Sequence, residues 1–408
     1  MSRIVVVGGG MAGASLALLL AQRTAHDVVL VEQVALSADS FPDAPSYDAR
    51  TTALALGSAE ILSAMGVWKT LAPYAAPIRH ISISHRGRFG AARLHAEEEG
   101  VAALGYVAEN RHIGFALLQS LRATRVEIRA PVKVLSATRQ AAGFAVELSG
   151  GSVLSADLLV VADGASSALR EALGVAVTSH HYEATAVVCN VSAREPHGDV
   201  AWERFTDDGA LALLPLIAGD GTPDSRRLGL VWSAPDARAR ALLEMPDHAF
   251  MAALEENTGG RLGGFRRVGV RNAWPLIRTV ATEQAVPGAV LVGNAAHLLH
   301  PVAGQGFNLT LRDLTALADT LAAAEVAGEA PGSLPMLQAW AAARARDQQF
   351  TAGLSHRLPQ LFGLDNAWLG MGRDAGLFIF DVLAPLKREF ARQTMGIGVF
   401  TGGVSRAG

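Results

Sequence analysis

The sequence predicts an α/β protein with a Rossmann-like N-terminal domain, an antiparallel-sheet domain inserted into it, and a helical C-terminal region. Three observations favour this fold. An apolar run at residues 4–7 leads into a glycine-rich turn and a helix rich in alanine and leucine. Short β-rich runs divided by polar turns fill residues 180–275, and apolar helical patterns dominate residues 351–408.

Composition narrows the class of protein. With 408 residues the chain is long enough for two domains, and its 50% hydrophobic content argues against disorder. The formal net charge of -3, without a long basic run, gives no reason to expect a nucleic-acid partner. The single cysteine, Cys189, excludes an intrachain disulfide and is typical of a reducing compartment. We expect it to be a small buried side chain.

The N-terminal unit has the order strand, glycine turn, helix, strand. Residues 4–7 and 28–31 are continuous apolar runs, as in strands covered on both faces, and residues 15–22 continue the helix between them. Glu32 ends the second strand, where a carboxylate can accept a hydrogen bond from a ribose hydroxyl. The turn has G-x-G-x-x-G spacing and comprises Gly8, Gly10, Met11, Ala12 and Gly13.

This unit predicts a dinucleotide site. Its glycines let the backbone approach a pyrophosphate, and the helix N-terminus supplies unpaired N–H groups and a partial positive charge. Glu32 would repel a 2′-phosphate, so NADP is not expected in this site, and FAD and NAD remain. The alternative is a glycine turn without a ligand, which the adjoining strands, helix and acid disfavour.

Two later stretches carry further turns. The apolar strand at residues 157–163 ends in Asp163 and Gly164, followed by Ser167 and Arg170. Taken alone, this stretch is equally well explained as a strand-to-helix turn with Asp163 as the N-cap. The second stretch, LVGNAAHLLHPVAGQGFNLTLRD, runs from a buried strand into a helix without an acidic residue before Asp313. That helix places Leu311, Leu314, Leu317 and Leu321 on one face.

Both stretches resemble motifs of the flavin-dependent aromatic hydroxylases. The first matches A-D-G-x-x-S-x-x-R, and the second matches G-D-A-A-H-x-x-x-P-x-x-G-Q-G-x-N except at Asn294, where most members carry Asp. An amide oxygen can accept the same hydrogen bond from a ribityl hydroxyl. The resemblance implies FAD as the cofactor, held by the second stretch through Gly293, Asn294, Pro301, Gly304, Gln305, Gly306, Phe307 and Asn308.

The resemblance also implies roles elsewhere. Arg50 would contact FAD near the ring, and Asn110 or Arg111 would lie by the ribityl and phosphate region; the alternative for the two arginines is a solvated charge. Asp163 and Gly164 would lie near the pyrophosphate, with Asp163 implicated in both FAD and NAD(P)H binding. The N-terminus of the helix after Gly304 would favour the anionic edge of reduced flavin.

No catalytic residue is assigned, because the flavin carries the chemistry. The candidates beside it are His300, Pro301 and Gln305. His297 and His300 have no evident acid or base partner in the sequence, so we expect structural or flavin-packing histidines. No further ligand pattern accompanies them, and no metal site is expected.

The resemblance extends over nearly the whole chain and is strongest to the octaprenyl-methoxyphenol hydroxylase branch of ubiquinone biosynthesis. It implies an FAD-dependent monooxygenase that hydroxylates the aromatic ring of a polyprenylated phenol. NAD(P)H would be a transient co-substrate, dioxygen the oxidant and a flavin hydroperoxide the reactive species. The alternatives are another ring position, a soluble aromatic substrate, a flavoprotein scaffold of the biosynthetic complex, or a flavin dehydrogenase or reductase.

The expected domains are discontinuous. Residues 1–77, 104–179 and 276–350 would form the FAD-binding domain, 78–103 and 180–275 the substrate domain, and 351–408 a helical C-terminal region. The apolar tail packs on the core or meets a membrane, a partner or a prenyl chain. Glycines interrupt the apolar N-terminal run, so we expect neither a signal peptide nor a spanning helix. A cytoplasmic location follows, with a peripheral position at the inner face of the membrane left open.

Overall fold

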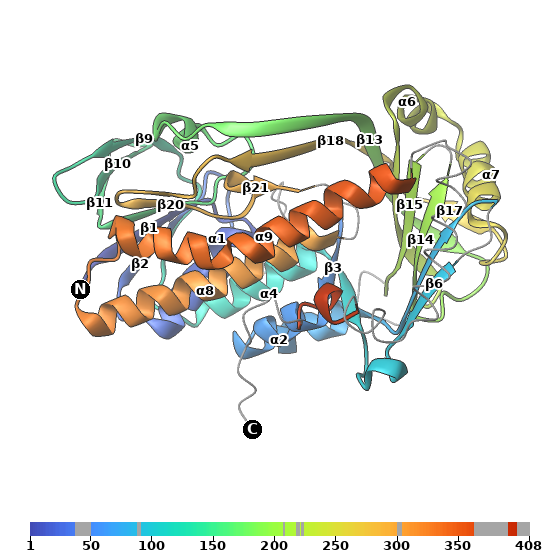
Figure 1. The fold of residues 1–408 in the computed structure, drawn as a ribbon, viewed down its shortest axis with the longest axis horizontal. Helices are drawn as coiled ribbons and strands as arrows, with labels where there is room; N and C mark the ends of the chain where they lie inside the picture. The colour runs from blue at the N-terminus through green and yellow to red at the C-terminus, as the bar shows by residue number, and fades with distance from the viewer. Residues whose placement is uncertain are drawn as a thin grey trace.

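A computed structural model describes residues 1–36, 50–87, 91–206, 209–217, 221, 224–299, 304–362 and 391–397. Two parts lie side by side in Figure 1: a layered α/β part that contains the N-terminus, and a twisted antiparallel sheet with helices on its outer side. Two long strands, β13 (Val177–Ala193) and β18 (Asn272–Ala281), run along the top and join the parts.

The α/β part is built on a six-stranded sheet of order β19-β20-β12-β1-β2-β8. Neighbouring strands run parallel except at the β19–β20 edge. Continuous valine, isoleucine and leucine runs form its centre because both faces are covered. The strands are β1 (Arg3–Val7), β2 (Asp27–Val31), β8 (Glu127–Arg129), β12 (Leu158–Val161), β19 (Ala285–Val286) and β20 (Ala289–Leu291).

Different layers cover the two faces of this sheet. The helices of one layer pack together in Figure 1, and the leucines predicted on one face of α8 are all buried. These helices are α1 (Met11–Arg23), α4 (Asn110–Arg122), α8 (Gln305–Ala327) and α9 (Leu334–Phe362). The other face packs against β9 (Val134–Arg139), β10 (Phe144–Leu148), β11 (Val153–Ala156) and α5 (Ala168–Ala172).

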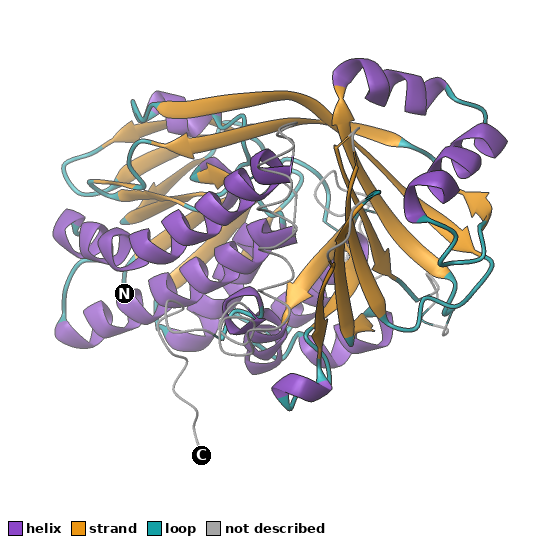
Figure 2. Cartoon of the chain, turned by 45° about the vertical axis from the view of Figure 1, so that its right-hand side comes forward, coloured by secondary structure: helices purple, strands orange, loops and turns teal. Residues whose placement is uncertain are grey.

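The second part is a nine-stranded sheet in which β14 and β5 form a parallel pair among antiparallel neighbours. Figure 2 shows this sheet with α6 (Asp236–Glu244) and α7 (Asp247–Thr258) on its outer side. Apolar side chains, including Cys189, fill the space beneath them. Besides β13 and β18, its strands are β5 (His80–His85), β6 (Ala91–His95), β14 (Val200–Thr206), β15 (Gly209–Pro215), β16 (Arg227–Pro235), β17 (Phe265–Val268) and β21 (His297–Leu298).

A small three-stranded sheet lies where the two parts meet. It contains β3 (Thr51–Ala55), β7 (Gly105–Glu109) and β4 (Ala76–Ile78). A Cβ at Gly229 of β16 would lie 2.9 Å from the Thr51 side chain, so the large sheet approaches β3 closely. The short helices are α2 (Leu56–Ala64), α3 (Trp68–Leu71), η1 (Ala72–Tyr74), η2 (Glu97–Glu99) and η3 (Gly293–Ala295).

The predicted fold class is confirmed: an α/β part, an inserted antiparallel sheet and helices toward the C-terminus. The domain boundaries remain a proposal, which the pairing of β5 and β6 with the large sheet supports. Most of the apolar tail, residues 363–390 and 398–408, lies outside the described residues. Within the described part of the chain, no helix combines the length and hydropathy needed to cross a bilayer.

Candidate active site

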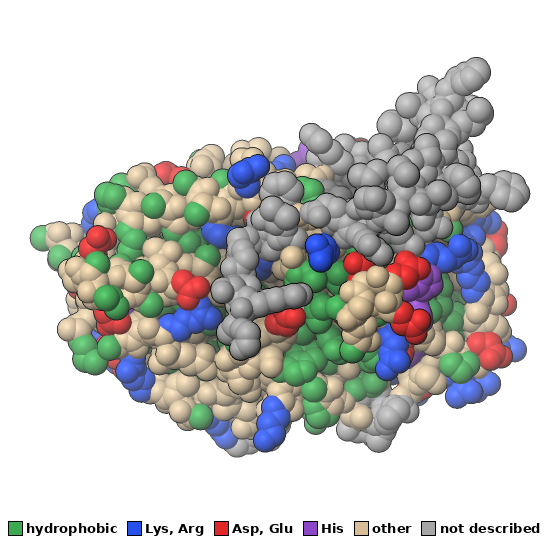
Figure 3. Space-filling view, turned by 60° about the horizontal axis from the view of Figure 1, so that its bottom comes forward, with side chains coloured by type: hydrophobic (Ala, Val, Ile, Leu, Met, Phe, Trp, Pro, Cys, Tyr) green, Lys and Arg blue, Asp and Glu red, His purple; other side chains and the backbone are tan. Residues whose placement is uncertain are grey.

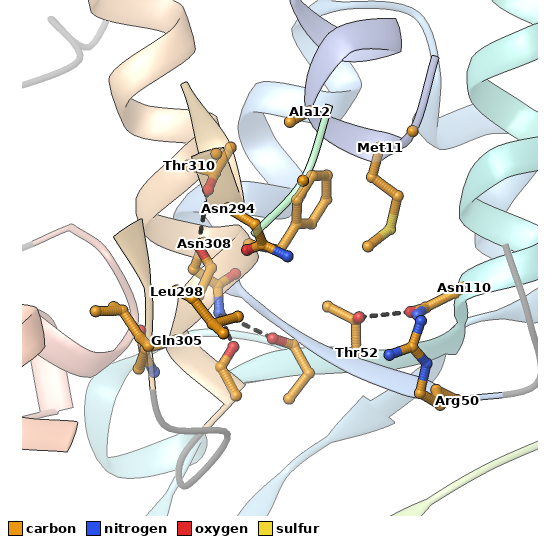
Figure 4. Close-up of a pocket in the computed structure, with 18 of the residues that line it drawn as sticks. Met11, Ala12, Arg50, Thr52, Asn110, Asn294, Leu298, Gln305, Asn308 and Thr310 are labelled. Atoms are coloured by element: carbon orange, nitrogen blue, oxygen red, sulfur yellow. Dashed lines mark hydrogen bonds between the residues drawn. The ribbon is translucent and has the colours of Figure 1, made fainter. Parts of the chain in front are cut away.

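One cavity of about 1530 Å³ lies between the α/β part and the large sheet. Pockets for single small molecules usually measure about 300–1,000 Å³, so this cavity has room for two ligands. Figure 4 shows Met11 on one side of it, Arg50 and Asn110 on another, and Asn294 and Gln305 opposite them. The predicted residues that line it are Gly8, Gly10, Met11, Ala12, Glu32, Arg50, Asn110, Asp163, Gly164, Gly293, Asn294, Gly304, Gln305, Gly306, Phe307 and Asn308.

The glycine turn forms the first wall. Gly8 has a φ of 105°, and a Cβ there would lie 2.4 Å from the carbonyl oxygen of Ala162. Gly13 does not line the cavity; a Cβ there would lie 1.8 Å from the Gly8 carbonyl oxygen, so it lets α1 pack tightly on the turn. Helix α1 has neither a side-chain cap nor an acidic residue in its first turn, and its N-terminus therefore favours an anion.

Glu32 is held at the edge of this wall. Its carboxylate accepts hydrogen bonds from the backbone N–H of Gly9 at 2.6 Å and of Val34 at 2.9 Å. An ionised carboxylate has about four acceptor positions, so Glu32 keeps capacity for a ribose hydroxyl. The two amides fix the orientation of the carboxylate before any ligand binds.

Asp163 lies in the turn after β12. Burial raises the pKa of its carboxyl, and hydrogen bonds from Ser167 and the backbone partly offset this effect. The N-cap residue of α5 is Ser167, whose hydroxyl accepts from the Arg170 backbone N–H at 3.0 Å. The alternative with Asp163 as N-cap is therefore wrong. The Arg170 guanidinium donates to the Ala295 carbonyl at 3.1 Å, which ties this motif to the segment after β20.

The segment after β20 lies directly against the glycine turn. Gly293 has a φ of 59°, and a Cβ there would lie 2.8 Å from the Cβ of Ala12. Only glycine fits this position without strain. Asn294 follows and lines the cavity beside the start of α1 (Figure 4). Two motifs far apart in the sequence thus form one continuous wall.

The start of α8 forms the next wall. Gly304, with a φ of 58°, is its N-cap residue, and its first turn contains no acidic residue and no side-chain cap. Asn308 is 1% exposed, accepts from the Ala55 N–H at 2.8 Å and donates to the carbonyls of Ala53 at 2.9 Å and Gly304 at 3.0 Å. Its amide thereby clamps β3 to α8 (Figure 4).

The predicted polar residues from the middle of the chain separate into two groups. The Arg50 guanidinium stacks on the Trp274 ring at 4.1 Å, and Asn110 accepts from the Thr52 hydroxyl at 2.7 Å. These residues line the cavity. Arg111 does not; its Nε lies 2.5 Å from an oxygen of the buried Glu109 carboxylate.

Neither of the two predicted histidines is seen to line the cavity in the described part of the chain. His300 and Pro301 lie outside the described residues. His297 is buried away from the cavity, and its Nε2 lies 3.0 Å from the Asp313 carboxylate. The expectation that His297 has no acid partner is therefore wrong. Asp313 stands in the next helix, and only the fold brings the two side chains together.

Asp313 is part of a buried ion network between α8 and α9. Its carboxylate accepts from the Arg344 guanidinium at 2.6 Å, while the Arg312 guanidinium contacts Asp347 at 2.8 and 3.0 Å. Burial alone would raise the pKa of Asp313, but His297 and Arg344 outweigh it and lower the pKa. The network fixes α8, whose N-terminus faces the cavity.

The large sheet supplies the remaining wall, which the sequence did not identify residue by residue. Alternate residues of β14 face the cavity at Ala201, Glu203 and Phe205. The neighbouring strands contribute Ile81, Ile83, Ala212, Leu214, Val231, Ser233, Ala186 and Val188. Glu203 is the one carboxylate on this wall within the described residues. The available signal was a charged residue in the apolar register of a strand.

Comparison with known proteins shows the family of this chain. The FAD binding domain family matches residues 1–351. Ubiquinone hydroxylase UbiL of Rhodospirillum rubrum is 34% identical over 397 residues, which cover 96% of this chain and 89% of the relative. The 3-demethoxyubiquinol 3-hydroxylase of Escherichia coli is 34% identical over 408 residues, with coverages of 97% and 99%. The chain belongs to this family of FAD-dependent ubiquinone-biosynthesis hydroxylases.

A solved structure supports the fold of this hydroxylase. The p-nitrophenol 4-monooxygenase PnpA of Pseudomonas putida superposes with a TM-score of 0.76 at 19% identity, covering 98% of this chain and all of that one. The hydroxylase is a flavin-dependent monooxygenase that uses FAD, with NAD(P)H as co-substrate. The two curated relatives carry different named activities, so the predicted branch remains a prediction.

The residues present fit FAD. Two helix N-termini without side-chain caps, those of α1 and α8, face one cavity. A pyrophosphate suits the first, and the electron-rich edge of a reduced isoalloxazine suits the second. Bound FAD supplies the redox chemistry, in which electrons from NAD(P)H activate dioxygen for transfer to a ring. The chain itself binds and orients the ligands, and it excludes water from the cavity.

Proposed function

We propose that this hydroxylase oxidises the aromatic ring of a polyprenylated phenol in ubiquinone biosynthesis, using NAD(P)H and dioxygen. One observation carries the proposal. A single cavity joins the glycine turn at Gly8 to the apolar wall of the large sheet, so a cofactor and a second, apolar molecule can occupy it together. The relatives named for ubiquinone hydroxylation support this substrate class.

The residues at the α/β side of the cavity are proposed to hold FAD. The turn from Gly8 to Ala12 would bind the pyrophosphate, and Glu32 the adenosine ribose. Asn294 would accept a hydrogen bond from the ribityl chain, while Arg50 and the backbone at Gly304–Gly306 would contact the ring. Each of these residues lines the cavity. Asn308 would support the FAD site by holding β3 against α8. Arg111 would support it through its ion pair with the Glu109 carboxylate.

The sheet side is proposed to receive the phenol ring and its tail. Apolar side chains of Ile81 and Leu94 line this side, and Ile78, Leu104 and Met395 line the cavity in contact with them. They offer contact to a prenyl chain without polar groups that would need hydration. Figure 3 shows hydrophobic side chains gathered near the middle of the lower face, with acidic and basic side chains around them.

A polyprenyl substrate resides in lipid, so the hydroxylase must receive it from a bilayer or from a partner. We propose a peripheral position at the cytoplasmic face of the membrane, in contact with other enzymes of the pathway. The apolar tail at residues 363–390 is the candidate contact. Flotation of the purified chain with vesicles, compared with a chain lacking these residues, tests this part.

Turnover on matched phenols tests the main proposal. The purified holoenzyme should oxidise NAD(P)H faster with a prenylated methoxyphenol than with the same ring lacking the tail. One atom from labelled dioxygen should appear in the product. Rapid NAD(P)H oxidation without labelled product would instead identify a reductase. Equal rates with and without the tail would identify a hydroxylase of soluble aromatics, and the ring position follows from the product.

A further inference from the structure

Glu203 is an isolated carboxylate in an apolar wall. It lies on β14, and the residues paired with it on either side are Ile83 of β5 and Ala212 of β15. Its side chain is only partly exposed, and that exposure is to the cavity. No hydrogen bond or ion pair joins its carboxylate to another described residue. An ionisable group without a partner costs stability, so its presence in this wall points to a ligand.

The charged groups around Glu203 face elsewhere. Arg204, its neighbour on β14, lies on the opposite face of the sheet beside Arg261. On β5, His85 shares the face of Ile83, but it does not line the cavity, and its ring bonds to the Arg86 carbonyl at 2.9 Å. Across the cavity, Arg50 stacks on Trp274. The strand neighbours that share the face of Glu203 are apolar: Ile83, Ala212, Ala201 and Phe205.

We propose that Glu203 is the catalytic residue that accepts the proton of the substrate's phenolic hydroxyl. This inference rests on the phenolic substrate class proposed above. The phenol O–H bond breaks, a carboxyl O–H bond forms on Glu203, and the electron pair stays on the phenolate oxygen. That oxygen donates electron density into the ring, which assists attack by an electrophilic oxygen. After the ring is oxidised, the carboxyl returns the proton to the product's phenolate oxygen.

The environment of Glu203 suits this step. Burial among apolar groups raises the pKa of its carboxyl from 4.5 to about 7. A general base works best when its pKa lies near the working pH, because it is then ionised yet still basic. The raised pKa also sets the pH dependence of the reaction. The carboxylate form of Glu203, which accepts the proton, becomes populated as the pH rises through about 7.

The decisive comparison is Glu203→Gln against wild type in a pH series. The wild-type kcat/KM should rise as pH increases through about 7. The kcat/KM of Glu203→Gln should not show this rise. At pH 8 its kcat/KM should fall by roughly a hundredfold, the usual worth of a general base. Flavin content should not change. The matched control is Glu256→Gln, an exposed carboxylate on α7 over the outer face of the same sheet. The kcat/KM of Glu256→Gln should rise with pH as in wild type.

Fluorinated phenols separate proton transfer from simple binding. Fluorine beside the hydroxyl makes the phenol more acidic, so such a substrate ionises without help. The deficit of Glu203→Gln should shrink with each added fluorine. Glu203→Asp keeps a carboxylate, so its kcat/KM should still rise with pH, although its rate should be lower than that of wild type. A deficit that is independent of phenol acidity, or a pH profile shared by wild type and Glu203→Gln, overturns the inference.

Thermal stability gives a readout that needs no substrate. Because the folded-state pKa is raised, ionising Glu203 destabilises the fold as the pH rises toward 7. Glu203→Gln should therefore raise Tm at pH 8 and change it less at pH 5. Equal shifts at both pH values contradict an unpaired carboxylate. If wild type turns over no prenylated phenol, the proposed function fails, whereas normal wild-type turnover with an unchanged variant rejects only the role of Glu203.

Discussion

At the residue scale, backbone geometry explains the glycines of the site. Gly8, Gly13 and Gly293 stand where a Cβ would lie within 3 Å of a neighbouring atom. Glycine is required at these positions because strand, helix and turn approach one another too closely for a larger residue. Gly10 differs from them because it faces the cavity at the start of α1.

Gly10→Val tests the phosphate-binding turn. Its side chain would occupy the space over the α1 N-terminus, and we expect FAD affinity to fall at least about tenfold. The ratio of flavin to protein absorbance after purification measures this, with circular dichroism to check folding. Gly353→Ala is the control, since a Cβ there meets no described atom within 4 Å and alanine favours a helix. A fully flavin-loaded Gly10→Val protein contradicts the assignment.

Asn294→Asp tests what the cavity requires at the position where the family usually carries aspartate. An amide oxygen and a carboxylate oxygen both accept hydrogen bonds, so we expect FAD affinity within about threefold of wild type. Asn294→Leu, which lacks an acceptor, should bind FAD more weakly by about tenfold, as for one lost hydrogen bond. Fluorescence titration of the apoprotein measures all three. Loss of FAD by the Asp variant would mean that the site needs a neutral group.

At the element scale, two contacts fix the start of α8. The Asn308 amide holds β3, and the ion network with α9 holds the next turn. Asn308→Ala removes three hydrogen bonds to backbone groups and should lower the free energy of unfolding by about 2–3 kcal/mol. Urea unfolding measures this. Asn272→Ala, on the exposed part of β18, should change stability by less than about 0.5 kcal/mol. Equal effects would contradict the clamp.

Asp313→Asn breaks the buried network. It leaves Arg344 and His297 without their shared carboxylate, and we expect a loss of about 3 kcal/mol or more at pH 7. Because the folded-state pKa of Asp313 lies below its ordinary value of 3.8, its contribution is complete above that value and is lost as the pH falls below it. The difference in unfolding midpoint between Asp313→Asn and wild type should therefore be smaller at pH 3 than at pH 7. The surface variant Asp319→Asn should cost under about 1 kcal/mol.

At the scale of the whole molecule, two sheets of different construction enclose one cavity. The α/β part contributes uncapped helix ends and tight turns, and the large sheet contributes an apolar face. This division lets cofactor binding and substrate binding be altered separately.

A graded series at Ala212 tests this separation. Ala212 faces the cavity from β15, next to Glu203 across the strands. Val, Leu and Phe at this position should raise the KM for the phenol in that order, by about tenfold for Phe, because each fills more of the substrate space. FAD content should stay constant. A parallel loss of flavin along the series would show that the two ligands share this wall.

The sequence alone determined the local features. The glycine turn, Glu32, the Asp163 turn, the 293–308 motif and the buried face of α8 follow from short-range requirements: backbone conformation, strand and helix periodicity, and the chemistry of a helix end. Those requirements lie within about twenty residues, so the fold class and a dinucleotide site could be predicted from them. The choice of FAD over NAD came from the resemblance to the flavin-dependent aromatic hydroxylases. Tertiary structure alone decided which distant groups meet. His297 with Asp313, Asn308 with β3, and Glu203 in the cavity wall depend on strand register and helix packing, which no local pattern specifies.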